Sequence, residues 1–484
     1  MSGPAFLSAI ELAEMIRSRE LSARELTMFF IDRIERLDGA VNAVAVRDFD
    51  RALARADVAD QALAAGRVLG PLHGVPMTIK ESFDIEGLPT TFGNPEFKDN
   101  IATSDARMVE RFKGAGAHFI GKTNVPIDLA DLQSYNDLYG VTGNPWDTTR
   151  TAGGSSGGSA AALAAGMSAL DSGSDIGGSI RNPAHFCGVY GHKPTWNVIS
   201  AKGHALPGTL AASDLGVVGP MARSAGDLAL AMDITAGPGP LEAPGWRLDL
   251  PRPRKSTLRQ YRVVIWPSDA LAPVDDAIAD RIAEIGELLG RLGATVSDSA
   301  RPAIDLADAI RTYKYLLHGA LSARTPEPVR QHYRELAAAL AAHDDSDRAI
   351  TARGTVQEHA AWLEHNNART ALRYAWQRFF ADWDVLICPP VASTAFAHEH
   401  GPFRDRTVTV NGNPQPYFQQ LFWAGLVTGP YLPSTVFPTG VAADGLPVGA
   451  QAVSGEFNDY LTIDFCRLLA RETGGFTPPP LYNN

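Results

Sequence analysis

The stretch that decides the predicted fold is residues 148–195, which read TTRTAGGSSGGSAAALAAGMSALDSGSDIGGSIRNPAHFCGVYGHKPT. Two glycine loops that carry serines, the first at residues 153–158 and the second at residues 175–179, bracket an alanine-rich run. Because glycine has no Cβ, such loops can turn several backbone N–H groups toward one oxygen atom. A serine at the end of such a loop is placed to attack the carbonyl group whose oxygen is held there. The stretch therefore predicts a catalytic centre for acyl transfer.

The second glycine loop supplies the candidate oxyanion hole. Its run Ile176, Gly177, Gly178 and Ser179 can aim four backbone N–H groups at one oxygen. We also expect Asp175 to fix this loop by accepting hydrogen bonds, and Arg181 to hold a carboxylate beneath it. The N-terminus of a predicted helix at residues 159–170 begins at the first glycine loop, where free amides favour developing negative charge.

A serine hydroxyl is a weak nucleophile until a base takes its proton, and the candidate base is Lys80. Apolar residues at positions 75, 77 and 79 alternate as in a half-buried strand, and Lys80 lies at the end of that strand. With a reference pKa near 10.4, only about one lysine in 2,000 is neutral at pH 7. Burial among hydroxyl groups can bring the pKa near 7. Glu81 should point to the opposite face of the strand.

Three motifs together resemble the amidase signature family. They are Gly-Val-Pro-x-x-x-Lys ending at Lys80, Gly-Gly-Ser-Ser-Gly-Gly-Ser at residues 153–159, and Gly-Ser-Asp-Ile-Gly-Gly-Ser-Ile-Arg at residues 173–181. The similarity extends over about residues 75–195 and recurs at residues 445–451. The resemblance implies a Ser-Ser-Lys triad in which Ser179 is the nucleophile, Ser155 is a bridging serine on a cis peptide, and Lys80 is the base.

The same resemblance implies an α/β fold with a large mixed, mostly parallel β-sheet sandwiched between helices (α/β/α). We expect a helical segment at residues 1–70 to pack on the body, and a catalytic domain at residues 71–484 to carry a helical insertion at about 303–383, which could cap the site. Capping boxes at Ser8–Glu11 and Ser22–Glu25 predict two helices, and a third is expected near residues 48–65. Strands are expected at residues 118–122, 261–266, 384–388 and 447–453, and further helices at 275–292 and 459–472.

Another interpretation makes Ser155 the nucleophile, because residues 153–157 also match the Gly-x-Ser-x-Gly elbow of α/β-hydrolases. That elbow should follow a strand directly, whereas residues 146–152 form a polar, turn-like run. The histidines nearest to it are His185, His192 and His204, and we expect each to be structural. Cys187 is expected to be a buried, inert thiol.

Composition narrows the class of protein. A net charge of −11 and the absence of a dominant basic cluster argue against nucleic-acid binding. Three widely spaced cysteines suggest neither a disulfide framework nor a zinc site, and no run of about 18 apolar residues predicts a membrane span. We expect a cytoplasmic protein that needs no metal or organic cofactor. Its oligomeric state is open, with a homodimer as one option.

The predicted activity is hydrolysis of a small-molecule amide through a seryl acyl-enzyme. An aryl or alkyl amide, an oligoamide and a carbamate are all candidate substrates. Aromatic residues at 417–431, which include Trp423, form either core or a substrate pocket, and the second option favours an apolar or aromatic substrate group. Two alternatives are a glutamine-dependent amidotransferase subunit that releases ammonia and a non-catalytic binding protein on the same fold.

Overall fold

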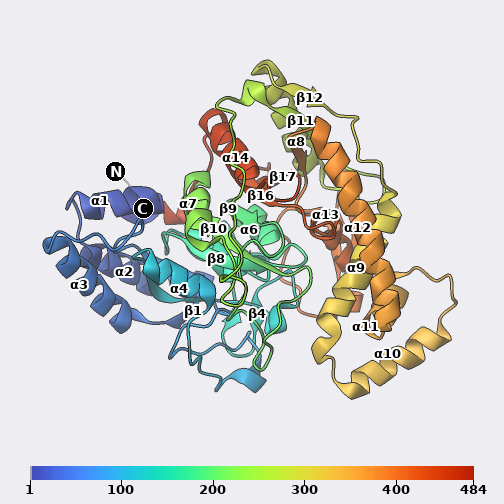
Figure 1. Ribbon diagram of the computed structural model, residues 1–484, viewed down its shortest axis with the longest axis horizontal. Coiled ribbons are helices and arrows are strands. Elements are labelled where there is room, and N and C mark those ends of the chain that lie inside the picture. The colour runs from blue at the N-terminus through green and yellow to red at the C-terminus, as the bar shows by residue number, and fades with distance from the viewer. Residues whose placement is uncertain (1–2, 484) are drawn as a thin grey trace.

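An eight-stranded sheet runs through the middle of the protein in the order β12-β11-β13-β17-β16-β9-β10-β8 (Figure 1). The computed structural model describes residues 3–483. The strands of this central sheet are β8 (Asp171–Asp175), β9 (Tyr190–Lys193), β10 (Val217–Ala222), β11 (Arg262–Ile265), β12 (Thr295–Ser297), β13 (Val385–Cys388), β16 (Ser434–Val441) and β17 (Pro447–Val453).

The sheet is mixed, as predicted, but the prediction that it is mostly parallel is wrong. Within the described residues, only β11 runs parallel to its neighbours, β12 and β13, and the other neighbouring strands pair antiparallel. The prediction followed from the resemblance. A strand, a helix and a second strand give a parallel pair, as in β11, α8 and β12. Short connections instead give antiparallel pairs, as at residues 442–446 between β16 and β17.

A second, three-stranded sheet contains the strand that ends at Lys80. It has the order β1-β3-β2, with β1 (Val44–Arg47), β2 (Pro76–Lys80) and β3 (His118–Thr123). Its strand β2 lies beside β8, because the Thr78 N–H donates to the Leu170 carbonyl at 3.2 Å and the Thr78 hydroxyl to Asp171 at 2.5 Å. The two sheets thus meet edge to edge, which brings the end of β2 close to the end of β8.

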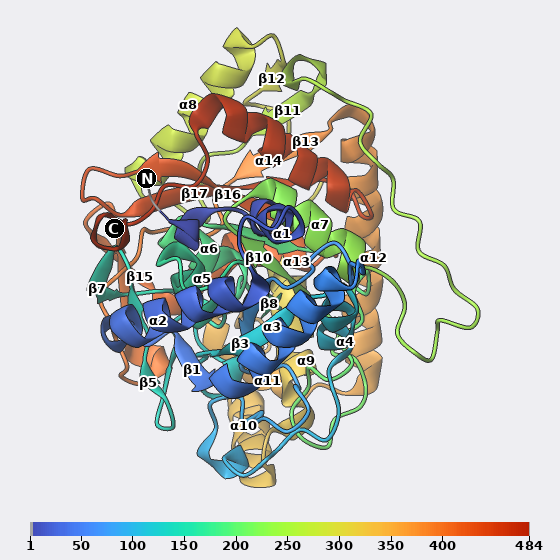
Figure 2. The same cartoon turned by 90° about the vertical axis from the view of Figure 1, so that its left-hand side faces the viewer.

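Helices cover both faces of the central sheet, which confirms the α/β/α layering. On β9, a Cβ at Gly191 would lie 2.7 Å from Ile180 at the start of α6, whereas His192 reaches Asp459 of α14. Consecutive strand residues point to opposite faces, so α6 and α14 lie on opposite sides. Figure 2 shows α7 beside α14. These helices are α5 (Gly157–Ala164), α6 (Arg181–Cys187), α7 (Ala225–Thr235), α8 (Asp276–Arg291) and α14 (Asp459–Thr473).

The buried helix that follows the first glycine loop is shorter than predicted. It ends at Ala164, because Gly166 adopts a φ of 68° and terminates the helix in the left-handed conformation. All of its residues are buried, and it packs unusually close to its neighbours. A Cβ at Gly158 would lie 2.3 Å from the backbone nitrogen of Asn124. This close approach requires glycine at the start of the helix.

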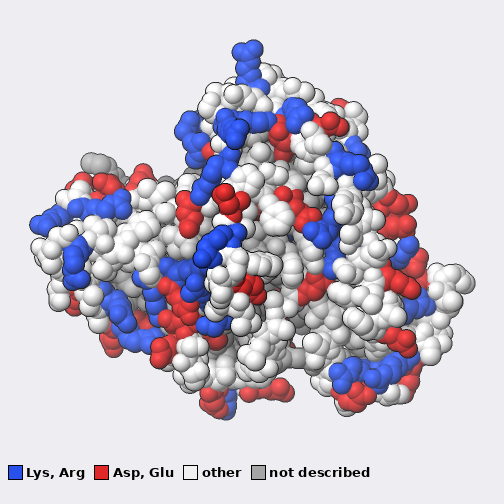
Figure 3. Space-filling model, viewed as in Figure 1, with Lys and Arg blue, Asp and Glu red and all other residues white. Residues whose placement is uncertain are grey.

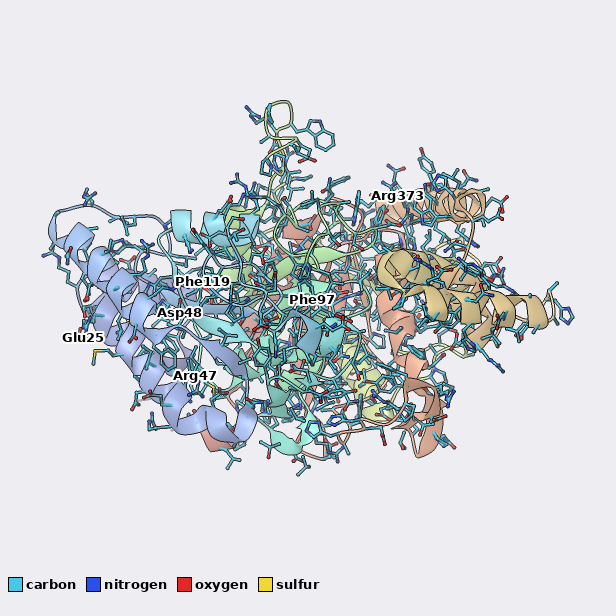
Figure 4. The ribbon with its side chains drawn as sticks, turned by 90° about the horizontal axis from the view of Figure 1, so that it is seen from below. Glu25, Arg47, Asp48, Phe97, Phe119 and Arg373 are labelled. Carbon is cyan, nitrogen blue, oxygen red and sulfur yellow. The ribbon has the colours of Figure 1, made fainter. Side chains whose placement is uncertain are left out.

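Two helical groups lie at opposite sides of the body (Figure 1), and Figure 4 shows the same separation between Glu25 of α2 and Arg373 of α12. The N-terminal group is α1 (Ala9–Arg17), α2 (Ala23–Val41) and α3 (Phe49–Ala64), and both predicted capping boxes form. The insertion holds α9 (Leu306–Leu321), α10 (Glu327–Ala339), α11 (Asp347–Thr355) and α12 (His359–Asp382). The division of the chain at residue 70 stays a prediction.

The remaining α-helices and strands are short. They are α4 (Arg107–Gly114), α13 (Phe422–Thr428) and three two-stranded sheets, β4 (Tyr135–Asn136) with β5 (Gly140–Val141), β6 (Gly143–Asn144) with β7 (Asp147–Thr151), and β14 (Thr407–Val410) with β15 (Asn413–Pro416). On the face in Figure 3, Lys and Arg side chains lie interspersed with Asp and Glu. Among residues 3–483, no helix combines the length and apolar character that a bilayer span requires.

Candidate active site

The ammonium or amine group of Lys80 lies among three serine hydroxyls. Its Nζ atom is 2.7 Å from Ser155 Oγ, 2.9 Å from Ser174 Oγ and 3.0 Å from Ser156 Oγ. Ser155 and Ser156 come from the first glycine loop, and Ser174 comes from β8. Sequence reasoning found Lys80 and Ser155 but did not assign a role to Ser156 or Ser174, although both stand inside the quoted motifs.

Burial decides the protonation of this lysine. The Lys80 side chain is fully buried, and burial lowers its pKa to about 7, while the more distant Asp175 and Asp171 oppose that effect. Glu81 points away, as predicted, and accepts the N–H groups of Thr91 at 2.6 Å and Phe92 at 2.9 Å. Across the described part of the chain, no salt bridge joins Lys80 to a carboxylate. The surroundings of the Lys80 amine are therefore uncharged and consist of serine hydroxyls.

The two glycine loops meet at their serines. The peptide bond between Gly154 and Ser155 is cis, and the Ser156 N–H donates to the Ser179 carbonyl at 3.1 Å. Ser179 is 7% exposed, whereas Ser155 is 1% exposed. Among residues 3–483, the Ser179 hydroxyl has no hydrogen-bond partner. The structure thus ties the backbone of Ser179 to the loop that carries Ser155, and leaves the Ser179 hydroxyl without a partner in the described chain.

A buried ion pair fixes the second glycine loop. Arg181 donates to Asp175 from Nη2 at 2.9 Å and from Nε at 3.0 Å, and neither side chain is exposed. Asp175 also accepts the N–H groups of Gly178 at 2.8 Å and Ile180 at 3.1 Å. Although burial opposes ionisation, Arg181 and these hydrogen bonds hold the pKa of Asp175 at about 2. The supporting role expected of both residues agrees with this geometry.

The oxyanion hole expected from the sequence needs one correction. The N–H group of Gly178 is already donated to Asp175, so the expectation that all four N–H groups are free is wrong at this position. The N–H groups of Ile176, Gly177 and Ser179 have no acceptor within residues 3–483. The sequence led us to expect that Asp175 accepts hydrogen bonds from this loop, but which N–H groups it takes depends on the turn that the loop adopts.

The elbow interpretation lacks a histidine. His185 is held by Gly449 and Ser393, His192 by Thr435 and Asp459, and His204 by Ser82. No hydrogen bond joins any of the three to Ser155 in the described chain. The turn-like character expected for residues 146–152 is wrong, since residues 147–151 form β7, but β7 pairs with β6 outside the central sheet.

The remaining side chains named from the sequence are structural. Cys187 is buried, its thiol lies 3.4 Å from the carbonyl of Ala152, and burial raises the pKa of the thiol. Trp423 is fully buried and packs edge-to-face on Trp266 with ring centroids 5.7 Å apart. Trp423 therefore belongs to the core, and no substrate preference follows from it. In residues 3–483, no cluster of three or more His, Cys, Asp or Glu side chains could hold a metal ion.

The sequence is similar to known proteins along nearly its whole length. The amidase family model matches residues 25–463. The chain belongs to the amidase signature family. It is 34% identical to an indoleacetamide hydrolase of Bradyrhizobium diazoefficiens (96% of this chain, 86% of the relative) and 33% identical to an acylamidase of Rhodococcus erythropolis (95% and 94%). It is 32% identical to a glutamyl-tRNA(Gln) amidotransferase subunit of a Synechococcus strain (94% and 95%).

A solved structure extends the comparison to three dimensions. The fold matches that of a bacterial aryl acylamidase of the same family with a TM-score of 0.81 and 25% identity, over 99% of this chain and 98% of that one. The fold is thus the amidase signature fold, and the chain is an amide-hydrolysing enzyme.

The buried ion pair under the second glycine loop yields a stability prediction. Replacing Arg181 with methionine leaves Asp175 as an unpaired buried charge, so the free energy of unfolding at pH 7 should fall by about 3–5 kcal/mol. Arg36→Met removes an exposed pair with Asp32 and should change it by less than about 1 kcal/mol. Urea unfolding of the wild type and the two variants measures both changes in stability. Equal stability of Arg181→Met and Arg36→Met would contradict the importance of the buried ion pair.

Proposed function

We propose that this amidase works through a seryl acyl-enzyme in which Ser179 is the nucleophile, Ser155 relays protons and Lys80 is the base. One observation carries the proposal, namely the 2.7 Å contact between Lys80 Nζ and Ser155 Oγ in a fully buried site. A neutral amine has two N–H donors and one lone pair. Three hydroxyls match it when Ser155 donates to Nζ and the other two accept.

The order of proton transfers follows from this arrangement. Ser179 Oγ attacks the amide carbon while its proton passes to Ser155 Oγ and the proton of Ser155 passes to Lys80 Nζ. Backbone N–H groups of Ile176, Gly177 and Ser179 stabilise the oxyanion. Lys80 then returns the proton through Ser155 to the leaving nitrogen as the C–N bond breaks. Water hydrolyses the resulting ester by the same path, releasing the carboxylate and freeing Ser179.

The surroundings of the second glycine loop support an apolar, aryl-bearing substrate. The apolar cluster around Ile176 consists of Leu215, Tyr313, Leu316, Leu317, Tyr431, Trp196, Trp362 and Leu421. Its members come from the insertion, from the loop after β9 and from around α13. Four members of this cluster keep some exposure, namely Ile176, Trp196, Trp362 and Leu421. Because they lie beside a proposed oxyanion donor, a bound substrate would extend along these apolar and aromatic side chains. The names of the indoleacetamide hydrolase and the acylamidases agree with such a substrate.

A second candidate is a subunit of a glutamine-dependent amidotransferase. The identity of 32% with an amidotransferase subunit over nearly the whole of both chains favours it as specifically as the match to an acylamidase does. Such a subunit would act on glutamine, a small polar amide, and would need partner chains. Charged side chains do lie against the apolar cluster around Ile176, since Arg369 and Arg373 contact the Tyr431 ring. They are already paired, Arg369 with Asp214 at 2.8 Å and Arg373 with Glu456 at 2.7 Å, so we rank this candidate second.

The nucleophile can be identified by covalent labelling. A serine-directed fluorophosphonate should label Ser179, and peptide mapping by mass spectrometry should find no label in Ser179→Ala, which should also lose at least about 10³-fold in kcat. Ser172→Ala is the matched control, because this buried hydroxyl has no hydrogen-bond partner in the described chain and should be dispensable. Label on Ser155 instead, or turnover retained by Ser179→Ala, would refute the proposal.

The base should give the reaction its pH dependence. Burial lowers the pKa of Lys80 to about 7, so the neutral form that accepts a proton is lost below that pH and complete above it. The rate of Ser179 labelling should therefore rise with pH, with a midpoint near about 7, and Lys80→Met should abolish it. Lys202→Met, on the surface, should keep the wild-type profile. A midpoint near 10, the ordinary pKa of a lysine, would contradict the lowering of the Lys80 pKa by burial.

A substrate panel separates the two candidate functions. With the isolated chain, kcat/KM for arylacetamides and acyl anilides should exceed that for glutamine by about 10²-fold or more, since the charged groups beside the cluster are already paired within the protein and leave the charges of glutamine unpaired. The rate of hydrolysis is measured as the release of ammonia or aniline. A preference for glutamine, or activity that requires added partner chains, would favour the amidotransferase subunit.

A further inference from the structure

The helical insertion reaches the second glycine loop through one hydrogen bond. Tyr313 of α9 donates its phenolic hydroxyl to the carbonyl of Ile176 at 3.0 Å. The side chain is 1% exposed, although it lies on an element 137 residues away in the sequence. Ile176 precedes Gly177, whose N–H group is one of the three proposed oxyanion donors. The contact thus joins a distant helix to the loop that stabilises the reaction.

Peptide geometry makes this contact directional. The bond between Ile176 and Gly177 is trans, so the Ile176 carbonyl and the Gly177 N–H belong to one plane and point in opposite directions. A donor that holds the carbonyl on one side therefore fixes where the N–H points on the other side. The hydrogen bond also polarises the peptide, which strengthens the N–H as a donor.

Tyr313 is itself held rigidly. Its ring packs on α13 where glycine leaves room, since a Cβ at Gly425 would lie 2.4 Å from the ring. Its hydroxyl lies 3.1 Å from the place where a Cβ of Gly177 would stand. From the other side, Arg181 donates to the Ala424 carbonyl at 3.1 Å and to Thr428 Oγ1 at 2.7 Å, both on α13. Helix α13 is therefore the common support of Tyr313 and of the ion pair under the loop.

We propose that Tyr313 is a positioning residue that aims the Gly177 N–H group at the oxyanion, and that the insertion takes part in catalysis through this hydrogen bond. The inference rests on the proposed function. Tyr313 acts on the loop through its hydrogen bond to the Ile176 carbonyl and donates no hydrogen bond to the substrate. Its hydroxyl should consequently stabilise the transition state more than the bound substrate, because the oxyanion develops only as Ser179 attacks.

The test is Tyr313→Phe, which keeps the ring packed on Gly425 and removes only the hydroxyl. We expect kcat for an acyl anilide to fall about tenfold with KM changed less than about twofold. The affinity for an arylalkyl trifluoromethyl ketone, which forms a tetrahedral adduct with the serine, should fall by the same factor. The affinity for the product carboxylate should stay within twofold, since it carries no tetrahedral oxyanion.

Tyr315→Phe is the matched control. It lies on the same helix two positions further, its ring stacks on His365 at 4.3 Å, and within residues 3–483 its hydroxyl makes no hydrogen bond to the second glycine loop. It should keep wild-type kinetics, and both variants should unfold at the wild-type temperature within about 3 °C. Wild-type kcat in Tyr313→Phe, a rise in KM alone, or equal losses in both variants would overturn the inference.

Fluorophosphonate labelling separates this inference from the proposed function. If Ser179 of the wild type is labelled and Tyr313→Phe keeps the wild-type kcat, the role of Tyr313 is overturned. Ser179 then remains the nucleophile. A wild-type enzyme labelled elsewhere would overturn the proposed function, and with it the reason to link Tyr313 to the oxyanion.

Discussion

The removal of Lys80 from water is the constraint on which the site depends. A buried ammonium group is costly, and here three serine hydroxyls at 2.7–3.0 Å replace water while no carboxylate of the described chain pairs with it. That choice keeps the pKa of Lys80 near 7. An adjacent carboxylate would have stabilised the protonated form of this amine and raised its pKa. The fold must therefore supply hydroxyl groups from two separate segments at the end of β2 and keep acidic groups at a distance.

The architecture meets this demand by joining two sheets at an edge. Contacts from Thr78 to Leu170 and Asp171 hold β2 beside β8, which brings Lys80 to Ser174 and to the serines of the first glycine loop. The two nearby acidic groups, Asp175 and Asp171, have other partners. Asp175 pairs with Arg181, and burial raises the pKa of Asp171 to about 7 while the Thr78 hydroxyl binds it. Charge is thus kept away from Lys80 by pairing in one case and by burial in the other.

The second glycine loop is held by a different set of contacts. Asp175, Arg181 and Gly178 hold the second glycine loop from within, and Tyr313 holds it from the helical insertion. The insertion also supplies apolar residues to the cluster around Ile176. The helical insertion therefore contacts both the second glycine loop and the apolar cluster around Ile176.

The sequence by itself determined the motifs, the local elements and the family. Lys80 at a strand end, two serine loops around a buried helix, and two capping boxes follow from short-range patterns, because spacing along the chain sets strand alternation, helix capping and loop geometry. Only the tertiary structure decided the antiparallel character of most of the sheet, the loss of Gly178 as a free donor, the core position of Trp423, and the contact of Tyr313 with Ile176. Each of these depends on which distant segments meet, and a linear pattern does not encode that pairing.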